Sequence, residues 1–126
     1  MAAILGQPTA NFEIMNILSY DPGQEYRPHH DYMDPAAKGF EQELAERGQR
    51  VATFLVYLND DFEGGETCFP DLDLKFRGDT GDALFFVSAS PDGEIDTRTT
   101  HAGLPPKNGS KWLLSQWVRN HPQTVY

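Results

Sequence analysis

Short runs of residues that favour β-strands recur along the chain, and turn-forming residues separate one run from the next. The run 50–58 is rich in Val, Thr, Phe and Tyr, and later runs are separated by Gly78-Asp79, Gly81-Asp82 and Lys107-Asn108-Gly109. β-Branched and aromatic residues favour extended backbone, whereas Gly, Asn and Asp favour turns. The even spacing is typical of an all-β sandwich or barrel and favours a double-stranded β-helix, or jelly roll.

One helix is expected among these strands. It covers 40–47 and ends at Gly48, a residue that commonly stops helices. Because it interrupts the strands, we expect it to cap or border them. In the first strand, period-two alternation is expected to place Ile14 and Tyr20 on the same face. The expected strands are 11–20, 25–32, 50–58, 66–69, 83–88, 97–102 and 111–119.

The size and charge of the chain narrow its class. With 126 residues it has room for one hydrophobic core, so a single domain is expected. Its net charge of -9, with only 10 basic residues, disfavours nucleic-acid binding. No window approaches the roughly 18 apolar residues of a membrane span, and no secretory signal is visible at the N-terminus. The single cysteine, Cys68, excludes an internal disulfide and suits a cytoplasmic location.

The sequence His29-His30-Asp31 carries the sharpest chemical signal. In an extended strand alternate side chains point the same way, so His29 and Asp31 are expected on one face and His30 on the other. One imidazole and one carboxylate are two of the three ligands of an iron(II) facial triad. His101 is the best candidate for the third. A His-x-Asp sequence is common by chance, and two His with a carboxylate also suit zinc, so the motif alone does not decide the metal.

A lysine in the last expected strand strengthens the metal hypothesis. In the run 111–118, Lys111 is expected to share a face with Leu113, Ser115 and Trp117, beside the interior of the barrel. A buried ammonium needs an anion. A dicarboxylate that chelates a metal at one end would offer its other carboxylate to Lys111. A solvent-facing lysine is the ordinary alternative.

Several ordered stretches together resemble the prolyl 4-hydroxylase group of iron(II)- and 2-oxoglutarate-dependent oxygenases. The resemblance covers about residues 16–117 and corresponds to the C-terminal catalytic jelly roll of that family. The matching stretches are Tyr20-Asp21-Pro22-Gly23-Gln24-Glu25-Tyr26, Pro28-His29-His30-Asp31-Tyr32, Arg50-Val51-Ala52-Thr53, Tyr57-Leu58-Asn59-Asp60, Gly64-Gly65-Glu66-Thr67-Cys68-Phe69-Pro70, Gly81-Asp82-Ala83-Leu84-Phe85-Phe86, His101-Ala102-Gly103 and Lys111-Trp112.

The resemblance implies cofactors and site residues. It implies iron(II), 2-oxoglutarate and O2, with ascorbate as an optional addition. Iron is expected at His29, Asp31 and His101, and the distal carboxylate of 2-oxoglutarate at Lys111. Tyr20 and Thr67 resemble the hydroxyl residues that help to hold this carboxylate, and Trp117 resembles an aromatic wall near the metal. Tyr20 and Trp117 are equally plausible as core aromatics.

The expected function is hydroxylation of a prolyl residue in a peptide or protein, coupled to conversion of 2-oxoglutarate and O2 to succinate and CO2. A non-catalytic jelly roll that binds a small acid, a hydroxylase of another amino acid or small molecule, and a zinc hydrolase are the alternatives. The hydrolase has no use for Lys111. Aromatic residues are candidates for a groove that binds proline, although each one alone is more plausible as an ordinary core residue. The candidates are Tyr32, Tyr57, Phe85, Phe86 and Trp112.

Two expectations concern how the site is covered. The family's usual N-terminal portion, which helps to build its substrate side, is expected to be missing, and a homo-oligomer is one way to cover the short side. The segment 34–48 is long, contains Gly39 and Gly48, and follows the proposed ligands directly. We therefore expect it to act as a lid over the substrate groove.

Overall fold

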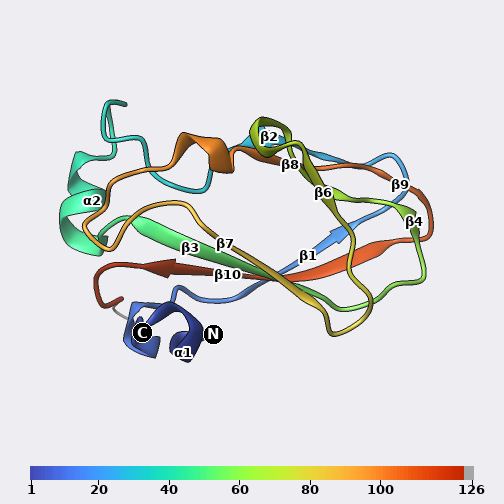
Figure 1. Ribbon diagram of the computed structural model, residues 1–126, viewed down its shortest axis with the longest axis horizontal. Helices are drawn as coiled ribbons and strands as arrows, with labels where there is room; N and C mark the ends of the chain where they lie inside the picture. The colour runs from blue at the N-terminus through green and yellow to red at the C-terminus, as the bar shows by residue number, and fades with distance from the viewer. Residues whose placement is uncertain (124–126) are drawn as a thin grey trace.

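Two four-stranded antiparallel sheets face each other in the computed structural model, which describes residues 1–123 (Figure 1). The first sheet has the strand order β1-β10-β3-β7 and the second has the order β2-β8-β5-β6, while β4 and β9 form a separate pair. This arrangement confirms the expected jelly roll. The strands are β1 (Asn16–Tyr20), β2 (Tyr26–His29), β3 (Arg50–Tyr57), β4 (Glu63–Gly64), β5 (Thr67–Phe69), β6 (Leu74–Phe76), β7 (Ala83–Val87), β8 (His101–Gly103), β9 (Pro106–Asn108) and β10 (Lys111–Arg119).

The first sheet is built around β3 and β10, the two longest strands. Their register pairs Leu113 with Tyr57 and Ser115 with Leu55, so alternate residues of both strands face the second sheet. Tyr57 and Leu113 are buried there and form the core cluster together with Phe62. The inward face of the first sheet therefore supplies both the hydrophobic core and one wall of any cavity between the sheets.

The outer face of the first sheet is covered at one end only. The N-terminal segment passes over this end, where Phe12 forms a bridge to Val118, and the short helix α1 (Ala2–Leu5) lies below the sheet in Figure 1. Beyond the covered end the outer face exposes apolar side chains. The expectation that a second copy of the chain covers the short N-terminal side stays a prediction. The exposed residues on this face are Ile17, Phe85, Val87 and Trp112.

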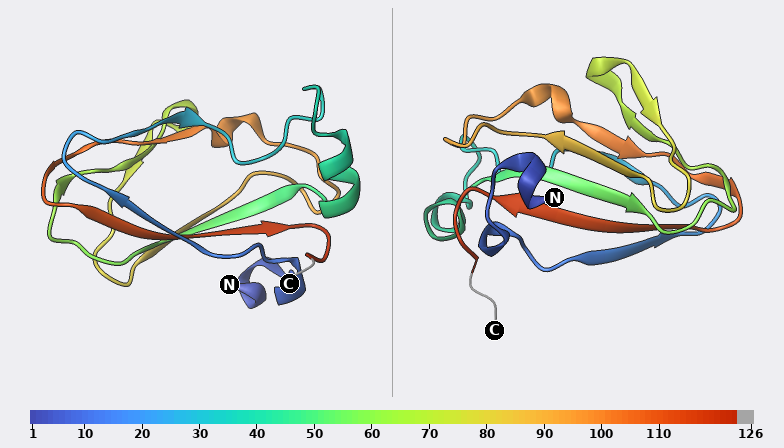
Figure 2. Two further views of the ribbon diagram at one scale, coloured as in Figure 1. Left: turned by 180° about the vertical axis from the view of Figure 1, so that it is seen from behind. Right: turned by 60° about the horizontal axis from the view of Figure 1, so that its bottom comes forward.

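The helix α2 (Glu41–Arg47) borders one end of the sheets, as the sequence predicts (Figures 1 and 2). Arg119, at the end of β10, holds it there: its guanidinium donates to a Glu43 carboxylate oxygen at 2.7 Å and to the Gly48 carbonyl at 2.9 Å. No helix among residues 1–123 is long and apolar enough to cross a membrane.

The first expected strand is shorter than predicted. A 3-10 turn occupies Thr9–Asn11, and β1 begins at Asn16 rather than at residue 11. The expectation that Ile14 and Tyr20 share a face is wrong, because the Ile14 side chain is 74% exposed whereas Tyr20 is partly buried. The neighbouring Glu13 side chain is buried instead and pairs with arginines, which breaks the period-two alternation.

Two other strand boundaries also differ from the prediction. The strand expected over 25–32 ends at His29, and the one expected over 97–102 is a 3-10 turn, Thr97–Thr99, followed by β8. The two differences have one cause. β2 pairs with β8, and β8 begins at His101, so residues 30–32 have no extended partner opposite them. Asp31 consequently lies just outside the sheet, in a bend.

The prediction missed the shortest elements. Strands β4, β6 and β9 contain two or three residues each, and α1 contains four. Runs this short carry too few positions for a periodicity to be detected. Their pairing partners, not their own sequence pattern, make them strands.

Candidate metal centre and its cavity

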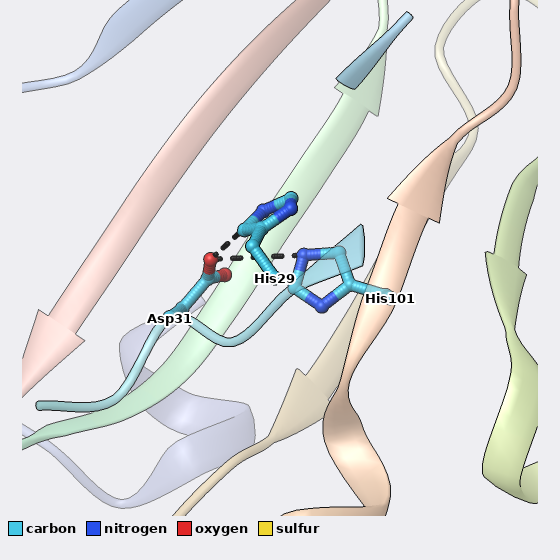
Figure 3. A group of neighbouring side chains, drawn as sticks. All are labelled: His29, Asp31 and His101. Carbon is cyan, nitrogen blue, oxygen red and sulfur yellow. Dashed lines mark ion pairs between the residues drawn. The ribbon is translucent and has the colours of Figure 1, made fainter. Parts of the chain in front are cut away.

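His29 and His101 are direct neighbours across the β2–β8 ladder. Their imidazole centroids are 4.3 Å apart. Asp31 follows from the bend after β2, and its Oδ1 lies 3.4 Å from His29 Nε2 and 3.6 Å from His101 Nε2 (Figure 3). The structure thus brings together the three residues that the sequence analysis selected, although Asp31 reaches them from a bend rather than from an extended strand.

Backbone carbonyls fix the orientation of both imidazoles. His29 Nδ1 donates to the Arg27 carbonyl at 2.7 Å, and His101 Nδ1 donates to the Thr99 carbonyl at 2.8 Å. With the proton on Nδ1, each Nε2 carries a free lone pair. Both Nε2 atoms face the Asp31 carboxylate, so their tautomers suit a shared cation.

The carboxylate of Asp31 is held ionised. Its Oδ2 accepts a hydrogen bond of 2.7 Å from the Thr53 hydroxyl. Burial alone would raise the pKa of Asp31, but His29, His101 and Thr53 outweigh burial and lower the pKa to about 2. A charged oxygen therefore faces the imidazoles at neutral pH.

The two imidazoles have different electrostatic surroundings. Burial disfavours the charged form of His29, but its contacts with Asp31 and the Arg27 carbonyl prevail and raise its pKa. In His101 burial prevails and lowers the pKa, despite the attraction of Asp31. Both shifts describe the site without a cation, which would compete with protons for the same lone pairs.

These donors fit a divalent metal. One ligand atom from each residue lies within 4.8 Å of the other two, and the residues form the one such cluster found among the described part of the chain. Two imidazole nitrogens and one carboxylate oxygen suit both non-haem iron(II) and zinc. The three residues therefore fit a metal ion, and the other residues of the cavity must indicate which metal and which reaction.

The cavity beside this cluster lies between the two sheets and is open to solvent. Residues of both sheets line it, and most of them are apolar or uncharged. Asp31 is the only acidic residue among the described residues of its lining, and Lys111 is its lysine. The lining consists of Leu18, Tyr20, Tyr26, His29, Asp31, Thr53, Leu55, Thr67, His101, Gly103, Lys111, Leu113, Ser115 and Trp117.

Lys111 faces this cavity as predicted, and it is only 1% exposed. Its Nζ donates to the Gly65 carbonyl at 2.6 Å, and no carboxylate lies within ion-pair distance of it in the described chain. Burial lowers the pKa of Lys111 to about 8, against a weaker opposing effect of Glu66. A buried ammonium with three donors and one neutral acceptor is a ready site for an anionic oxygen.

Tyr20 and Thr67 lie in the same cavity. Tyr20 pairs directly with Lys111 across the β1–β10 ladder, and the Lys111 Nζ is 5.5 Å from the Tyr20 ring centroid. Burial, with a contribution from Tyr26, raises the pKa of Tyr20 to about 12, so its hydroxyl keeps its proton. Thr67 is 2% exposed, and its hydroxyl is 3.3 Å from the Tyr57 hydroxyl.

Trp117 forms part of the cavity wall on β10. The Arg50 guanidinium lies over its ring, 3.7 Å from the centroid. Its buried Nε1–H has no acceptor among the described residues. Trp117 therefore lies in the cavity lining with a cation stacked on its ring, which the sequence did not indicate, and its role as an aromatic wall near a metal stays a prediction.

The sequence analysis missed two further residues of the centre. Thr53 orients Asp31, and Tyr26 stacks on the His29 ring with a centroid distance of 3.9 Å. Thr53 shares a face of β3 with Tyr57, a residue that was selected. Tyr26 lies three residues before His29, and the register shift between them, which no sequence pattern shows, brings both to the same side. Strand alternation was the signal that could have identified Thr53.

The five aromatic residues expected to line a proline groove do not gather in one place. Phe85 and Trp112 are each 45% exposed on the outer face of the first sheet, and Tyr57 is fully buried in the core. Only Phe86 packs beside the cluster, with its ring 4.7 Å from that of His101. The expectation fails because odd and even residues of a strand point to opposite faces of the sheet.

Together, a jelly roll and a cluster of two histidines and one aspartate define a non-haem metal protein whose cavity also contains a buried cation. Residues 15–119 match the family model described as the 2OG-Fe(II) oxygenase superfamily. The chain belongs to this superfamily. Within it, the chain is prolyl 4-hydroxylase-like, as the resemblance in the sequence indicated.

Three relatives show this likeness. Prolyl 4-hydroxylase 1 of Arabidopsis thaliana is 42% identical over 125 residues, which cover 89% of this chain and 42% of that protein. Prolyl 4-hydroxylase subunit alpha-2 of Gallus gallus is 35% identical over 93% of this chain and 21% of its own length. The crystal structure of the viral collagen prolyl hydroxylase of Paramecium Bursaria Chlorella virus-1 in complex with 2OG matches with a TM-score of 0.72 and 38% identity, over 86% of this chain and 59% of that one. This chain therefore spans less than half the length of either of these curated relatives.

Proposed function

We propose that this chain carries the catalytic jelly roll of a prolyl hydroxylase and that His29, Asp31 and His101 hold its iron(II). The observation that carries the proposal is the convergence of these three groups in the cavity that contains the buried Lys111. Three protein ligands leave three positions on an octahedral iron for other molecules. We choose a dicarboxylate as one of these molecules, because its second carboxylate can pair with the buried Lys111.

The second part of the proposal concerns 2-oxoglutarate. We place its distal carboxylate at Lys111, where a charge-assisted hydrogen bond would compensate the buried ammonium. The Tyr20 and Thr67 hydroxyls are further donors in the same cavity. Trp117 and the leucines of the lining would keep water from the space between the two ends of the cosubstrate.

When bound, iron(II) and 2-oxoglutarate supply the oxidising chemistry: O2 converts the cosubstrate to succinate and CO2, and one oxygen atom is inserted into a C–H bond of the substrate. The protein contributes binding, orientation and exclusion of water. His29 and His101 present lone pairs in fixed directions, Asp31 supplies a negative charge held by Thr53, and Lys111 fixes the far end of the cosubstrate.

For the substrate we propose a proline-containing peptide or protein. The likeness to proteins named prolyl 4-hydroxylases supports this choice. The structure offers Tyr26, which is 42% exposed, lines the cavity and stacks on His29. Its open face is suited to pack against an apolar ring. A zinc hydrolase is disfavoured, because among the described residues of the lining only Asp31 could act as a carboxylate base, and it is engaged with the histidines.

We also propose that the segment 34–48 acts as a lid. Its first part, 34–40, consists of turns and is largely exposed, and it follows Asp31 closely in the chain. The helical part is tied to the end of β10 through Arg119 and Glu43. Movement would therefore be confined to 34–40, and α2 would serve as its anchor.

The test of the proposed function is succinate formation from 2-oxoglutarate by the iron(II)-loaded chain, with and without a panel of proline peptides. We expect succinate and hydroxyproline in equal amounts. His29→Ala should abolish both, whereas His30→Ala is the matched control, because His30 is exposed and bonds to the Tyr32 carbonyl rather than to the cluster. If another amino acid stimulates iron-dependent succinate formation and the proline peptides do not, the chain is a hydroxylase of that amino acid rather than a prolyl hydroxylase. Absence of turnover with every substrate would contradict the proposal.

A further inference from the structure

A buried carboxylate lies outside the cavity but is connected to its wall. Glu13 precedes β1, and its side chain is 8% exposed. Its backbone is fixed on β10, because Glu13 N–H donates to the Trp117 carbonyl at 3.0 Å and the Gln116 side chain donates to the Glu13 carbonyl at 2.6 Å. The carboxylate therefore has a defined position beside the strand that carries Trp117.

The Glu13 carboxylate receives a fork of two hydrogen bonds from one arginine. Arg50 Nε donates to it at 2.7 Å and Arg50 Nη2 at 3.2 Å, while Arg119 Nε donates at 3.1 Å. Burial would raise the pKa of Glu13, but Arg50 and Arg119 lower it, so the group is ionised. A planar guanidinium bound at two points to a carboxylate has little rotational freedom.

The opposite side of Arg50 contacts two residues that line the cavity. Its guanidinium covers the Trp117 ring at 3.7 Å, and its Nη1 is 3.4 Å from the Asp31 carbonyl. Trp117 is a cavity wall, and Asp31 is a proposed metal ligand. One arginine thus links a carboxylate in the N-terminal segment to both the wall and the ligand bend.

We infer that Glu13 is a positioning residue of the proposed hydroxylase: it locks the Arg50 guanidinium onto Trp117 and thereby fixes the cavity wall beside the metal centre. The inference depends on the proposed function. The Glu13 carboxylate makes no hydrogen bond to a proposed metal ligand and does not line the cavity, so its effect on the Trp117 ring passes through Arg50. The segment before β1 therefore helps to shape the cavity.

The chain offers a matched control for this carboxylate. Glu43 also binds Arg119, at 2.7 Å, and lies 3.6 Å from Arg47, but it makes no hydrogen bond to Arg50 among those of the described residues. Loss of the Glu43 charge disturbs Arg119, which also binds Glu13, but leaves the Arg50 guanidinium on the Trp117 ring. Glu13→Gln and Glu43→Gln should therefore differ in the cavity, even if both reduce stability.

The first readout is the fluorescence of Trp117 in the Trp112→Phe background, which leaves Trp117 as the single tryptophan. Glu13→Gln should change its emission, because the guanidinium leaves the ring face, and Glu43→Gln should not. Glu13→Asp, which keeps the charge, should restore part of the signal. This readout does not require turnover, so it remains valid if the proposed function fails.

The second readout is steady-state turnover with a peptide that the unmodified chain hydroxylates. Glu13→Gln should raise the KM for the peptide by about fivefold or more and change the Kd for 2-oxoglutarate by less than about twofold. Its effect should be non-additive with that of Trp117→Phe, whereas the effect of Glu43→Gln should be additive. If Glu13→Gln does not fold, Arg50→Lys tests the same link, because lysine keeps the charge but cannot form the fork. Equal behaviour of the Glu13 and Glu43 variants in both readouts would overturn the inference.

Discussion

The two proposed histidine ligands use the same local device. In each, Nδ1 donates to the carbonyl of the residue two positions earlier, Arg27 for His29 and Thr99 for His101. This bond fixes the tautomer and the ring direction before any metal arrives. Hydrogen bonds of this kind commonly raise ligand basicity and metal affinity. At the scale of single residues, the centre is thus organised by neighbours in the sequence as well as by the fold.

A hydrogen bond from Thr53 orients the Asp31 carboxylate in the same way. Thr53 is 1% exposed and donates to Asp31 Oδ2 at 2.7 Å. We predict that Thr53→Val weakens metal binding about 10- to 100-fold, because the carboxylate loses the bond that orients it. Titration of iron(II) under anaerobic conditions measures this change. Thr53→Ser, which keeps the hydroxyl, should bind nearly as well as the original chain. Equal losses in the Val and Ser variants would show that packing, and not the hydrogen bond, matters at this position.

Lys111 predicts how 2-oxoglutarate binding depends on pH. Its pKa is lowered to about 8 by burial, so the ammonium is present below this pH and is lost as the pH rises through it. The distal carboxylate of 2-oxoglutarate binds the charged ammonium of Lys111 more strongly than the neutral amine. The Kd for 2-oxoglutarate should therefore be constant below about pH 7 and rise about tenfold per pH unit above about pH 8. Isothermal titration calorimetry over this range measures it.

The control for this pH dependence is Lys111→Met, which keeps an unbranched apolar chain. It should bind 2-oxoglutarate more weakly at neutral pH, and the slope above about pH 8 should disappear. Tyr20 does not contribute to the slope, since its pKa is raised to about 12. A slope that persists in the methionine variant would locate the titrating group elsewhere.

At the scale of elements, long strands were predictable and their ends were not. β10 begins at Lys111 and ends at Arg119 as expected, because nine residues of alternating pattern define both the strand and its inward face. β2 ends before Asp31 because its partner β8 is short, and β1 starts late because Glu13 is buried with Arg50. Such ends are set by partners distant in sequence, which local patterns do not contain.

The junction between α2 and β3 offers a stability test. Gly48 has φ 76° and ψ -178°, a conformation that glycine alone adopts readily. An added Cβ would also collide with the Asn120 and His121 side chains. We predict that Gly48→Ala lowers the free energy of unfolding by about 2 kcal/mol or more. Gly81→Ala is the control, with φ 90° and no atom within 4 Å of the added Cβ. Urea denaturation should show the larger loss for Gly48, and equal losses would contradict the predicted collision.

The proposed lid makes a prediction about the segment 34–48. Limited proteolysis should cut at 34–40 in the free chain, and cutting should slow when iron(II), the non-reactive analogue N-oxalylglycine and a proline peptide are all present. The helical part should resist cleavage in both states, because Glu43 binds Arg119. Cleavage at the same rate with and without the three ligands would exclude the lid.

At the scale of the whole molecule, the sequence was sufficient to select the three clustered residues and the buried Lys111, but not the residues around them. His29, His101 and Lys111 lie in strands and Asp31 lies in the bend after β2. Their residue types, together with the family resemblance of the surrounding stretches, were enough to select them. The roles of Arg50 behind Trp117 and of Thr53 on Asp31 depend on contacts between distant strands. The aromatic groove failed for the same reason, since its candidates lie on different faces of the sheets.

The fold also shows how a chain spanning less than half the length of these curated relatives can bring all three proposed ligands together. Every proposed ligand lies on β2, in the bend after it, or on β8, and Lys111 lies on β10. These elements are all inside the jelly roll. We therefore expect binding of iron(II) and 2-oxoglutarate to be a property of this chain itself.

The most direct test of that claim is the visible spectrum of the chain after anaerobic addition of iron(II) and 2-oxoglutarate. We expect a weak charge-transfer band that requires both additions, is absent in His101→Ala, and needs more 2-oxoglutarate in Lys111→Met. A chain that binds zinc but stays colourless with iron(II) and saturating 2-oxoglutarate would contradict this expectation.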